Sequence, residues 1–181
     1  MNIKHQQSGF SLIEVLVTAV ILSTGLLGIA GLQLSSIKNS HNAFLETQAR
    51  YMATTLLDNI RANPQGISNY LADGTVFNCP VSAPTPTCIS TATGTTPCTA
   101  TQLAISERHR AICGSEVGSS VNGGVKNELP EASMTIQCIA ADGTFGNDCS
   151  TRDVSISIFW GERDLNNGGI TLTSLRITGS I

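Results

Sequence analysis

Charged and aromatic residues are scarce in this chain. Of its 181 residues, 13% are charged and 4% are aromatic, and the formal net charge is −3 at pH 7. A nucleic-acid-binding surface usually has a basic stripe or aromatic stacking platforms. No nucleic-acid partner is therefore predicted, although these numbers leave a DNA contact open. Because the chain has only three histidines and no Cys-x-x-Cys pair, no metal centre is expected either.

Sequence motifs for catalysis are missing too. The chain has no Walker A sequence, and the segment 114–118 places its serine at the wrong position for a nucleophile elbow. The segment Asp164–Gly169 begins like a calcium loop. Its fifth position is Gly168 and its twelfth would be Leu175, so it fails the EF-hand pattern. A looser calcium site in that loop stays an alternative. We predict no enzymatic activity and no cofactor.

One long apolar stretch lies near the N-terminus and contains a single charge. The 25 residues from Phe10 to Leu34 include no Lys, Arg, Asp or His, and Glu14 is their only ionisable side chain. As a helix they would be about 37 Å long, enough to cross a bilayer core of about 30 Å. An ionised group costs about 2.5–3.5 kcal/mol at the centre of such a span and less near its end. Glu14 therefore needs a partner.

The segment around this charge resembles the prepilin signature of type IV pilins and type II secretion pseudopilins. It follows a polar leader with Lys4 and His5, and it reads Gly9-Phe10-Ser11-Leu12-Ile13-Glu14. The resemblance implies that a prepilin peptidase cuts between Gly9 and Phe10 and methylates the new N-terminus at Phe10. It also implies that Phe10 and Glu14 are assembly contacts. In a low dielectric, a neighbouring subunit's ammonium would strongly favour the ionised form of Glu14.

Other interpretations of the apolar stretch stay open. The residues Gly28-Ile29-Ala30 could be a secretory cleavage site, or the stretch could be a plain single-span anchor. Gly25, Gly28 and Gly31 could allow close helix packing, could weaken the helix, or could simply be tolerated in a membrane. The flanking positive charges are nearly balanced, so they do not decide the orientation.

The cysteines indicate an oxidising compartment. All six fall between Cys79 and Cys149, outside the apolar stretch, and they predict three disulfides in a periplasmic domain. Six cysteines allow 15 pairings, which the sequence does not distinguish. Cys138 with Cys149 is the first choice. The second choice pairs Cys79 with Cys88 or Cys98, and pairs Cys113 with the remaining cysteine. The cysteines are Cys79, Cys88, Cys98, Cys113, Cys138 and Cys149.

A second helical pattern follows the apolar stretch. Apolar residues recur at a spacing of three and four, and Pro64 ends the pattern. The apolar positions are Leu45, Ala49, Met52, Ala53, Leu56, Leu57 and Ile60. One helix should therefore run to about Ala62. The predicted segments are a leader (1–9), a transmembrane and assembly helix (10–34), its amphipathic continuation (35–62) and a globular head (63–181).

The head changes from irregular and helical patterns to strands. Residues 78–101 are rich in Thr, Pro and Ala and predict an exposed loop. A short helix is expected over Thr101–Ile112, where the run Arg108–Arg110 would be a solvated face or a partner contact. Period-two alternation predicts strands at 134–138, 154–160 and 170–177, with a slip near Ser174 and a long loop from Gly161 to Gly169. Trp160 should be core or sheet edge.

These patterns predict an α+β fold in which a long N-terminal helix packs on a C-terminal antiparallel sheet. This is the pilin architecture, and within the family the chain most resembles PilV-type minor pilins. The features that carry this likeness include Glu128-Leu129-Pro130 before a strand and the alternation from Val154 to Trp160.

The resemblance implies a minor pilin that primes type IV pilus assembly and sits in the tip complex. Its partners would be other minor pilins, the major pilin, the prepilin peptidase, the assembly platform and the bacterial inner membrane. The chain would cross that membrane once, with its head in the periplasm, and then reach the pilus and the cell surface. The alternatives are a type II secretion pseudopilin and a tethered, disulfide-rich binding or adhesin domain that does not polymerise.

Overall fold

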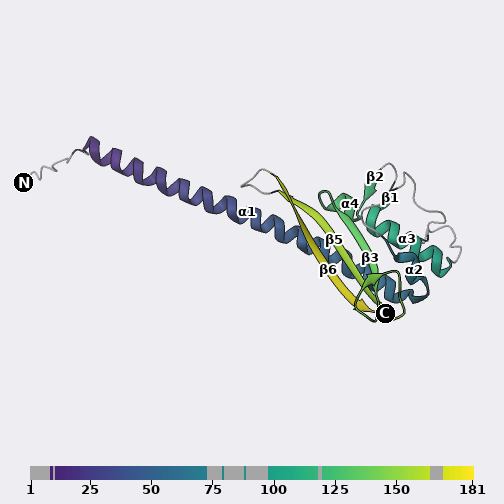
Figure 1. Ribbon diagram of the computed structural model, residues 1–181. Helices are drawn as coiled ribbons and strands as arrows, with labels where there is room; N and C mark the ends of the chain where they lie inside the picture. Colours follow the sequence, from purple (N-terminus) through teal and green to yellow (C-terminus); the bar gives the residue numbers. More distant parts are fainter. Residues whose placement is uncertain are drawn as a thin grey trace, which may run out of the picture. The chain divides into compact units, whose positions relative to one another are not determined.

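The computed structural model describes residue 9 and residues 11–72, 79, 88, 98–117, 120–163 and 169–181 (Figure 1). Phe10, the predicted first residue after cleavage, lies outside the described residues. The chain divides into two compact units, Met1–Ala43 and Phe44–Ile181. Helix α1, Leu12–Ala62, runs through the boundary between them. The helix ends at the residue that the sequence predicts.

The first unit is helical and presents its side chains outward. Every described side chain from Ser11 to Ile37 is exposed, including apolar residues such as Leu12 (83% exposed) and Leu27 (74%). An apolar side chain gains free energy only when it leaves water. This part of α1 therefore carries a surface that suits a lipid or protein environment.

The second unit begins with the amphipathic part of α1. Six of its residues are buried, and they repeat at the three-four spacing that places side chains on one helix face. They are Leu45, Ala49, Ala53, Leu56, Leu57 and Ile60. After Ala62 the chain turns at Asn63, because a residue before proline disfavours the α conformation. The short helices η1 (Pro64–Gly66) and α2 (Ile67–Tyr70) follow.

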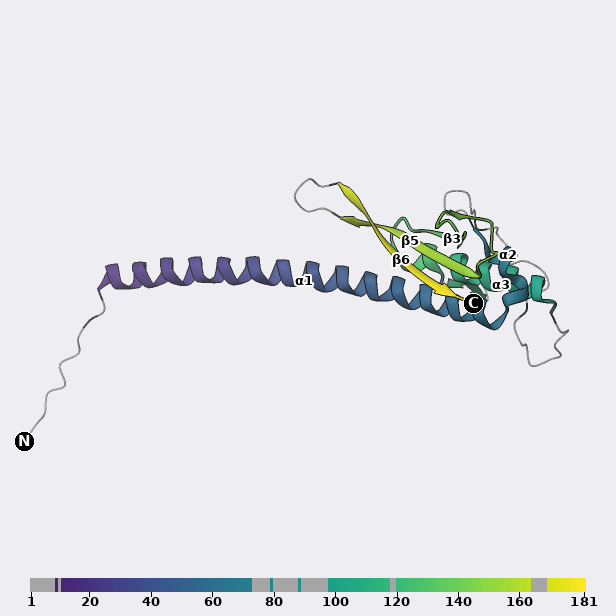
Figure 2. The same cartoon turned by 60° about the horizontal axis from the view of Figure 1, so that its bottom comes forward.

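A four-stranded antiparallel sheet forms the other layer of the head (Figure 2). Its strands are β3 (Ser133–Ile139), β4 (Phe145–Gly146), β5 (Asp153–Arg163) and β6 (Ile170–Ser180), in the order β4-β3-β5-β6. Alternate side chains of β3 and β5 enter the core with the buried α1 face. These are Met134, Ile136, Cys138, Val154, Ile156, Ile158 and Trp160. The predicted α+β fold, with its helix on an antiparallel sheet, is confirmed.

The predicted loop between the last two strands is too long. Gly161 pairs with Leu172 and Arg163 pairs with Ile170, so β5 extends into it as far as Arg163. The slip expected near Ser174 is not a break, because the pairing register is continuous from Asp153 to Arg163. Instead, the apolar residues change faces there. Ile170 and Leu172 lie on the exposed face of β6, opposite the partly buried side chains further along the strand. Residues 164–168 begin the segment that was considered as a loose calcium site, and they lie outside the described residues.

Several short elements lie between α2 and β3 in the sequence. Helix α3, Ala100–Cys113, confirms the predicted short helix, and Thr99 and Gln102 form a capping box at its start. The elements β1 (Ser115–Val117), β2 (Ser120–Asn122) and α4 (Val125–Glu128) were not predicted. A tight backbone crossing closes the β1–β2 pair just before α4, where a Cβ on Gly124 would lie 2.2 Å from the nitrogen of Gly114. Such short pieces leave no periodic pattern in the sequence.

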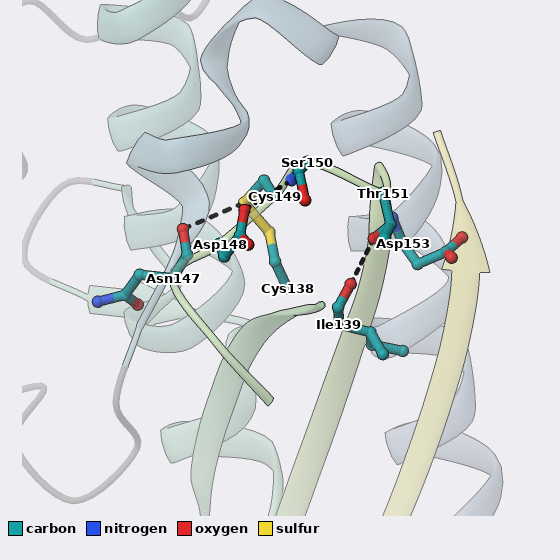
Figure 3. The surroundings of a disulfide bond; sticks show 8 residues. All are labelled: Cys138, Ile139, Asn147, Asp148, Cys149, Ser150, Thr151 and Asp153. Carbon is teal, nitrogen blue, oxygen red and sulfur yellow. Dashed lines mark hydrogen bonds between the residues drawn. A yellow bond between two sulfur atoms is a disulfide. The ribbon is translucent and has the colours of Figure 1, made fainter. Parts of the chain in front are cut away.

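The structure forms three disulfides. The predicted Cys138–Cys149 bond is confirmed, and it ties the end of β3 to the segment after β4 (Figure 3). The Thr151 hydroxyl donates a hydrogen bond to the Ile139 carbonyl beside it. The other two pairings were predicted wrongly. They are Cys79–Cys113 and Cys88–Cys98.

The wrong pairings have a structural reason. Cys113 is 5% exposed at the end of α3 and belongs to the core cluster, and the exposed Cys79 forms a disulfide with it. Cys88 and Cys98 then close a short loop, with a separation of 10 residues. The sequence between these cysteines has no periodicity from which this geometry could have been predicted. Most of the predicted loop 78–101 lies outside the described residues.

Candidate assembly site

The candidate site begins in the first turn of α1. Gly9 is exposed, and Glu14 is the acidic residue of the first helical turn. The Glu14 amide donates to the Ser11 carbonyl at 3.0 Å. A carboxylate at this position interacts favourably with the positive end of the helix dipole. Its backbone placement is therefore compatible with a regular helix, although its surroundings are apolar.

The surface around Glu14 is a continuous apolar sleeve. Among the described residues, one helix is long and apolar enough, by length and composition, to cross a membrane, and it is α1. The apolar residues nearest the charge are Leu12, Ile13, Val15, Leu16 and Val17, all between 48% and 83% exposed. In lipid, each polar group in such a segment must find a partner.

The hydroxyl groups of this sleeve meet that requirement inside the helix. Thr18 donates to the Val15 carbonyl at 2.8 Å, and Ser23 donates to the Val20 carbonyl at 2.9 Å. Thr24 likewise donates to backbone carbonyls of the preceding turn. Such bonds to the preceding turn let hydroxyls sit in an apolar helix without an unsatisfied donor.

Glu14 differs from these hydroxyls. Within the part of the chain that the structure describes, its carboxylate makes no ion pair. A carboxylate cannot donate to its own helix carbonyls, so it needs a cation or a donor from elsewhere. The geometry leaves the charge on the surface of the helix, where another molecule can reach it.

The three glycines of the sleeve lie within the regular helix. No described atom outside their own helix turn lies within 4 Å of a Cβ built on Gly25, Gly28 or Gly31. Nothing inside the chain therefore requires glycine at these positions. A role in packing against another helix and simple tolerance in a membrane both stay open.

A second polar group of residues lies in the head, and the sequence did not reveal it. The Asn63 side chain donates to the Ala100 carbonyl at 2.8 Å and to the Tyr70 hydroxyl at 3.4 Å. The Tyr70 hydroxyl donates to the Glu107 carboxylate. Burial, and next the bond to Glu107, raises the pKa of Tyr70 above its usual value. These contacts join the end of α1 to α2 and α3.

The charge run on α3 is less solvated than predicted. Arg108 donates to the Leu71 carbonyl at 2.8 Å, and burial lowers the pKa of its guanidinium. His109 is 7% exposed and Arg108 is half-buried, so only Arg110 of the three is fully exposed. The solvated-face interpretation is wrong for Arg108 and His109, because α3 turns them towards the interior. No group of three or more His, Cys, Asp or Glu among the described residues could hold a metal ion.

A long N-terminal helix on a four-stranded antiparallel sheet, with three disulfides and an apolar N-terminal half, defines a pilin-like class of protein. Comparison with family models agrees. Residues 4–30 match the prokaryotic N-terminal methylation motif, and residues 31–107 match type IV pilin Tt1218. Over these ranges the chain is similar to type IV pilins that carry the N-terminal methylation motif. Comparisons with curated proteins and with solved structures gave no match.

Proposed function

We propose that this chain is a minor pilin, similar to the PilV type, that primes assembly of a type IV pilus and sits in its tip complex. One observation carries the proposal. The methylation motif at 4–30 leads into an exposed apolar helix whose first turn holds Glu14. A structural subunit needs such a helix to remain in a membrane before assembly and then to pack with the helices of other subunits.

Processing comes first in this proposal. A prepilin peptidase removes the leader 1–9, cutting after Gly9, and methylates the amine of Phe10. The methylated amine stays cationic. An ammonium of this kind on a neighbouring subunit is the partner that Glu14 needs, because opposite charges attract strongly in a low dielectric. The pair would also fix how far adjacent helices are staggered.

The membrane arrangement follows from the same residues. Residues 10–34 span the inner membrane once, 35–62 continue the helix, and 63–181 form a periplasmic head. Three disulfides support an oxidising compartment for the head. On assembly, the helix leaves the lipid and enters the pilus, with other minor pilins, the major pilin and the assembly platform as partners.

The N-terminal residue of the membrane-extracted protein tests this function. We expect mass spectrometry to find a chain that begins at methylated Phe10, and an uncut chain in cells without prepilin peptidase. An intact Met1 in normal cells, or a chain that begins near Gly31, would exclude the pilin mechanism and leave a tethered or secreted binding domain.

A second experiment separates a minor pilin from a pseudopilin. Pili sheared from cells should contain the mature chain in small amounts, and cells that lack it should form fewer pili. Normal piliation together with a block in protein secretion would instead support the type II secretion alternative.

A further inference from the structure

A small pocket opens between α1 and α3 in the head. It has a volume of about 250 Å³, which is below the range of pockets that enclose drug-sized ligands. Met52, Leu56 and Ala111 provide apolar lining, and Tyr51 and Arg110 are exposed lining residues. We call this the α1–α3 pocket. Its size and its apolar lining suit a single aliphatic side chain.

The head also exposes apolar side chains at the end of the β5–β6 hairpin. Leu172 is 71% exposed and Ile170 is 57% exposed, both on the outer face of β6. Glu131 lies beside them, because the Gly161 amide donates to the Pro130 carbonyl at 2.9 Å and Gly161 pairs with Leu172. We call Ile170, Leu172 and Glu131 the hairpin patch.

The patch and the pocket complement one another in the kind of side chain that they present and in charge. The patch offers an aliphatic side chain beside a carboxylate, and the pocket offers an apolar lining beside the guanidinium of Arg110. The other carboxylate at the pocket, Glu107, already accepts the Tyr70 hydroxyl. An aliphatic anchor in a pocket with a charge pair at its rim is how interface hot spots are usually built.

Within one chain, strand β6 and the α1–α3 pocket lie on different sides of α1. Leu57 and Arg61 of α1 contact the β6 side, where a Cβ on Gly179 would lie 2.7 Å from Leu57. Thr55 and Asn59 line the pocket. Because successive residues turn by about 100° on a helix, these two pairs lie on nearly opposite sides of α1. Two different surfaces that fit each other join copies head to tail and can repeat without closing.

We propose that the hairpin patch of one copy inserts Leu172 into the α1–α3 pocket of a second copy of this chain. The inference rests on the proposed function, since helices held in the membrane before assembly, and in the pilus after it, bring heads side by side. Arg110 of one copy then pairs with Glu131 of the next. The contact is heterologous, because each copy contributes a different surface to it.

Cross-linking between two differently tagged full-length copies tests the contact. One copy carries Thr55→Cys at the pocket and the other Ser174→Cys, an exposed residue two positions from Leu172 on the same face of β6, so that the leucine anchor is kept. The matched control replaces Thr55→Cys with Thr54→Cys, an exposed residue one helix position away that does not line the pocket. The native cysteines are all in disulfides, so no native thiol competes. We expect about tenfold more cross-linked dimer from the pocket pair than from the control pair, as for an anchor that buries a leucine side chain.

Three outcomes would overturn the proposal: equal yields from both pairs, no dimer, or a cross-link from Ser174→Cys to a different protein. Processing at Phe10 and the presence of the chain in sheared pili are scored in the same cells. If the chain enters pili but no dimer forms, only the contact fails. If a pocket-specific dimer forms in membranes but the chain never enters pili, the pilus function fails and the contact stands.

Charge reversal gives an independent readout. Arg110→Glu or Glu131→Arg alone should lower the dimer yield about two- to fivefold, the range of an exposed ion pair. The double variant, which restores the pair in the opposite sense, should recover it. Both residues are exposed, so the head should keep its protease resistance. A double variant no better than the two single variants would contradict the pairing.

Discussion

The two parts of α1 show how one continuous helix can serve two environments. In the first unit, apolar side chains surround the helix and are exposed, and hydroxyls bond to the backbone of their own helix. In the second unit, one face is buried and the charges lie outside it. There Arg50 pairs with Glu46 at 3.0 Å and Arg61 pairs with Asp58 at 3.1 Å. The two parts differ in where their side chains find partners.

This difference has an energetic consequence. The second part is stabilised by its own head, because burying a leucine side chain contributes about 1.5–3 kcal/mol. The first part buries almost nothing within its own chain, so its apolar surface must be covered by lipid or by other subunits. Substitutions in the first part should change assembly, and substitutions in the second should change folding.

The largest expected effect on assembly comes from Glu14→Ala. We expect entry of the chain into pili to fall about a hundredfold, because breaking a buried ion pair costs about 3 kcal/mol or more. Head stability should not change. Immunoblots of sheared pili and thermal unfolding of the extracted protein measure the two effects. Glu46→Ala is the control, since its exposed pair with Arg50 is worth about 0.5 kcal/mol. Equal incorporation of the two variants would contradict the claim that the first part of α1 acts in assembly.

The disulfides stabilise only the second part, and unequally. In the loop-entropy estimate, removing Cys79–Cys113, with a separation of 34 residues, costs about 4 kcal/mol. Removing Cys88–Cys98, with a separation of 10, costs about 3 kcal/mol. Denaturant unfolding of the double-serine variants should show this order. A larger loss for Cys88–Cys98 would mean that native contacts, rather than the unfolded chain, set the difference.

Paired leucine truncations sharpen the comparison within α1 itself. Leu56 is 1% exposed in the head, and Leu22 is 66% exposed in the first unit. Leu56→Ala should lower the free energy of unfolding by about 3 kcal/mol, as for other buried leucines. Leu22→Ala should leave it within about 0.5 kcal/mol of the native value. Thermal melts followed by near-UV circular dichroism in detergent report the head alone. A comparable loss for Leu22→Ala would show that the first part also stabilises the head.

Strong periodic patterns made much of the fold predictable. The end of α1 at Ala62 follows from Pro64, and the strands of the sheet follow from their alternation. The charge of Glu14 inside an apolar run marked the candidate site, but its partner could not be found within one chain. The predictions that were wrong depended on tertiary geometry. Examples are the Cys79–Cys113 pairing and the change of face near Ser174 in β6.

The polar residues of the head were missed for the same reason. Tyr70 and Asn63 stand in no motif, and their bonds to Glu107 and Ala100 join segments that are 37 residues apart. Arg108 and His109 looked like a solvated run because the sequence does not reveal which way a short helix turns its face. Only packing against α2 and the end of α1 decides this.

The smallest expected effect concerns pH and the second part of α1. Because burial and Glu107 raise the pKa of Tyr70, the folded head keeps its proton at pH values where the unfolded chain releases it. The folded state then binds more protons, so stability is complete below about pH 10 and falls above it, by at most about 1.4 kcal/mol per pH unit. Tyr70→Phe should flatten this fall, whereas Tyr51→Phe, at a residue that is 68% exposed, should not. Unfolding of the extracted protein between pH 8 and pH 11 measures both slopes. If the two slopes were equal, the coupling between α1 and α3 through Tyr70 would not contribute to stability.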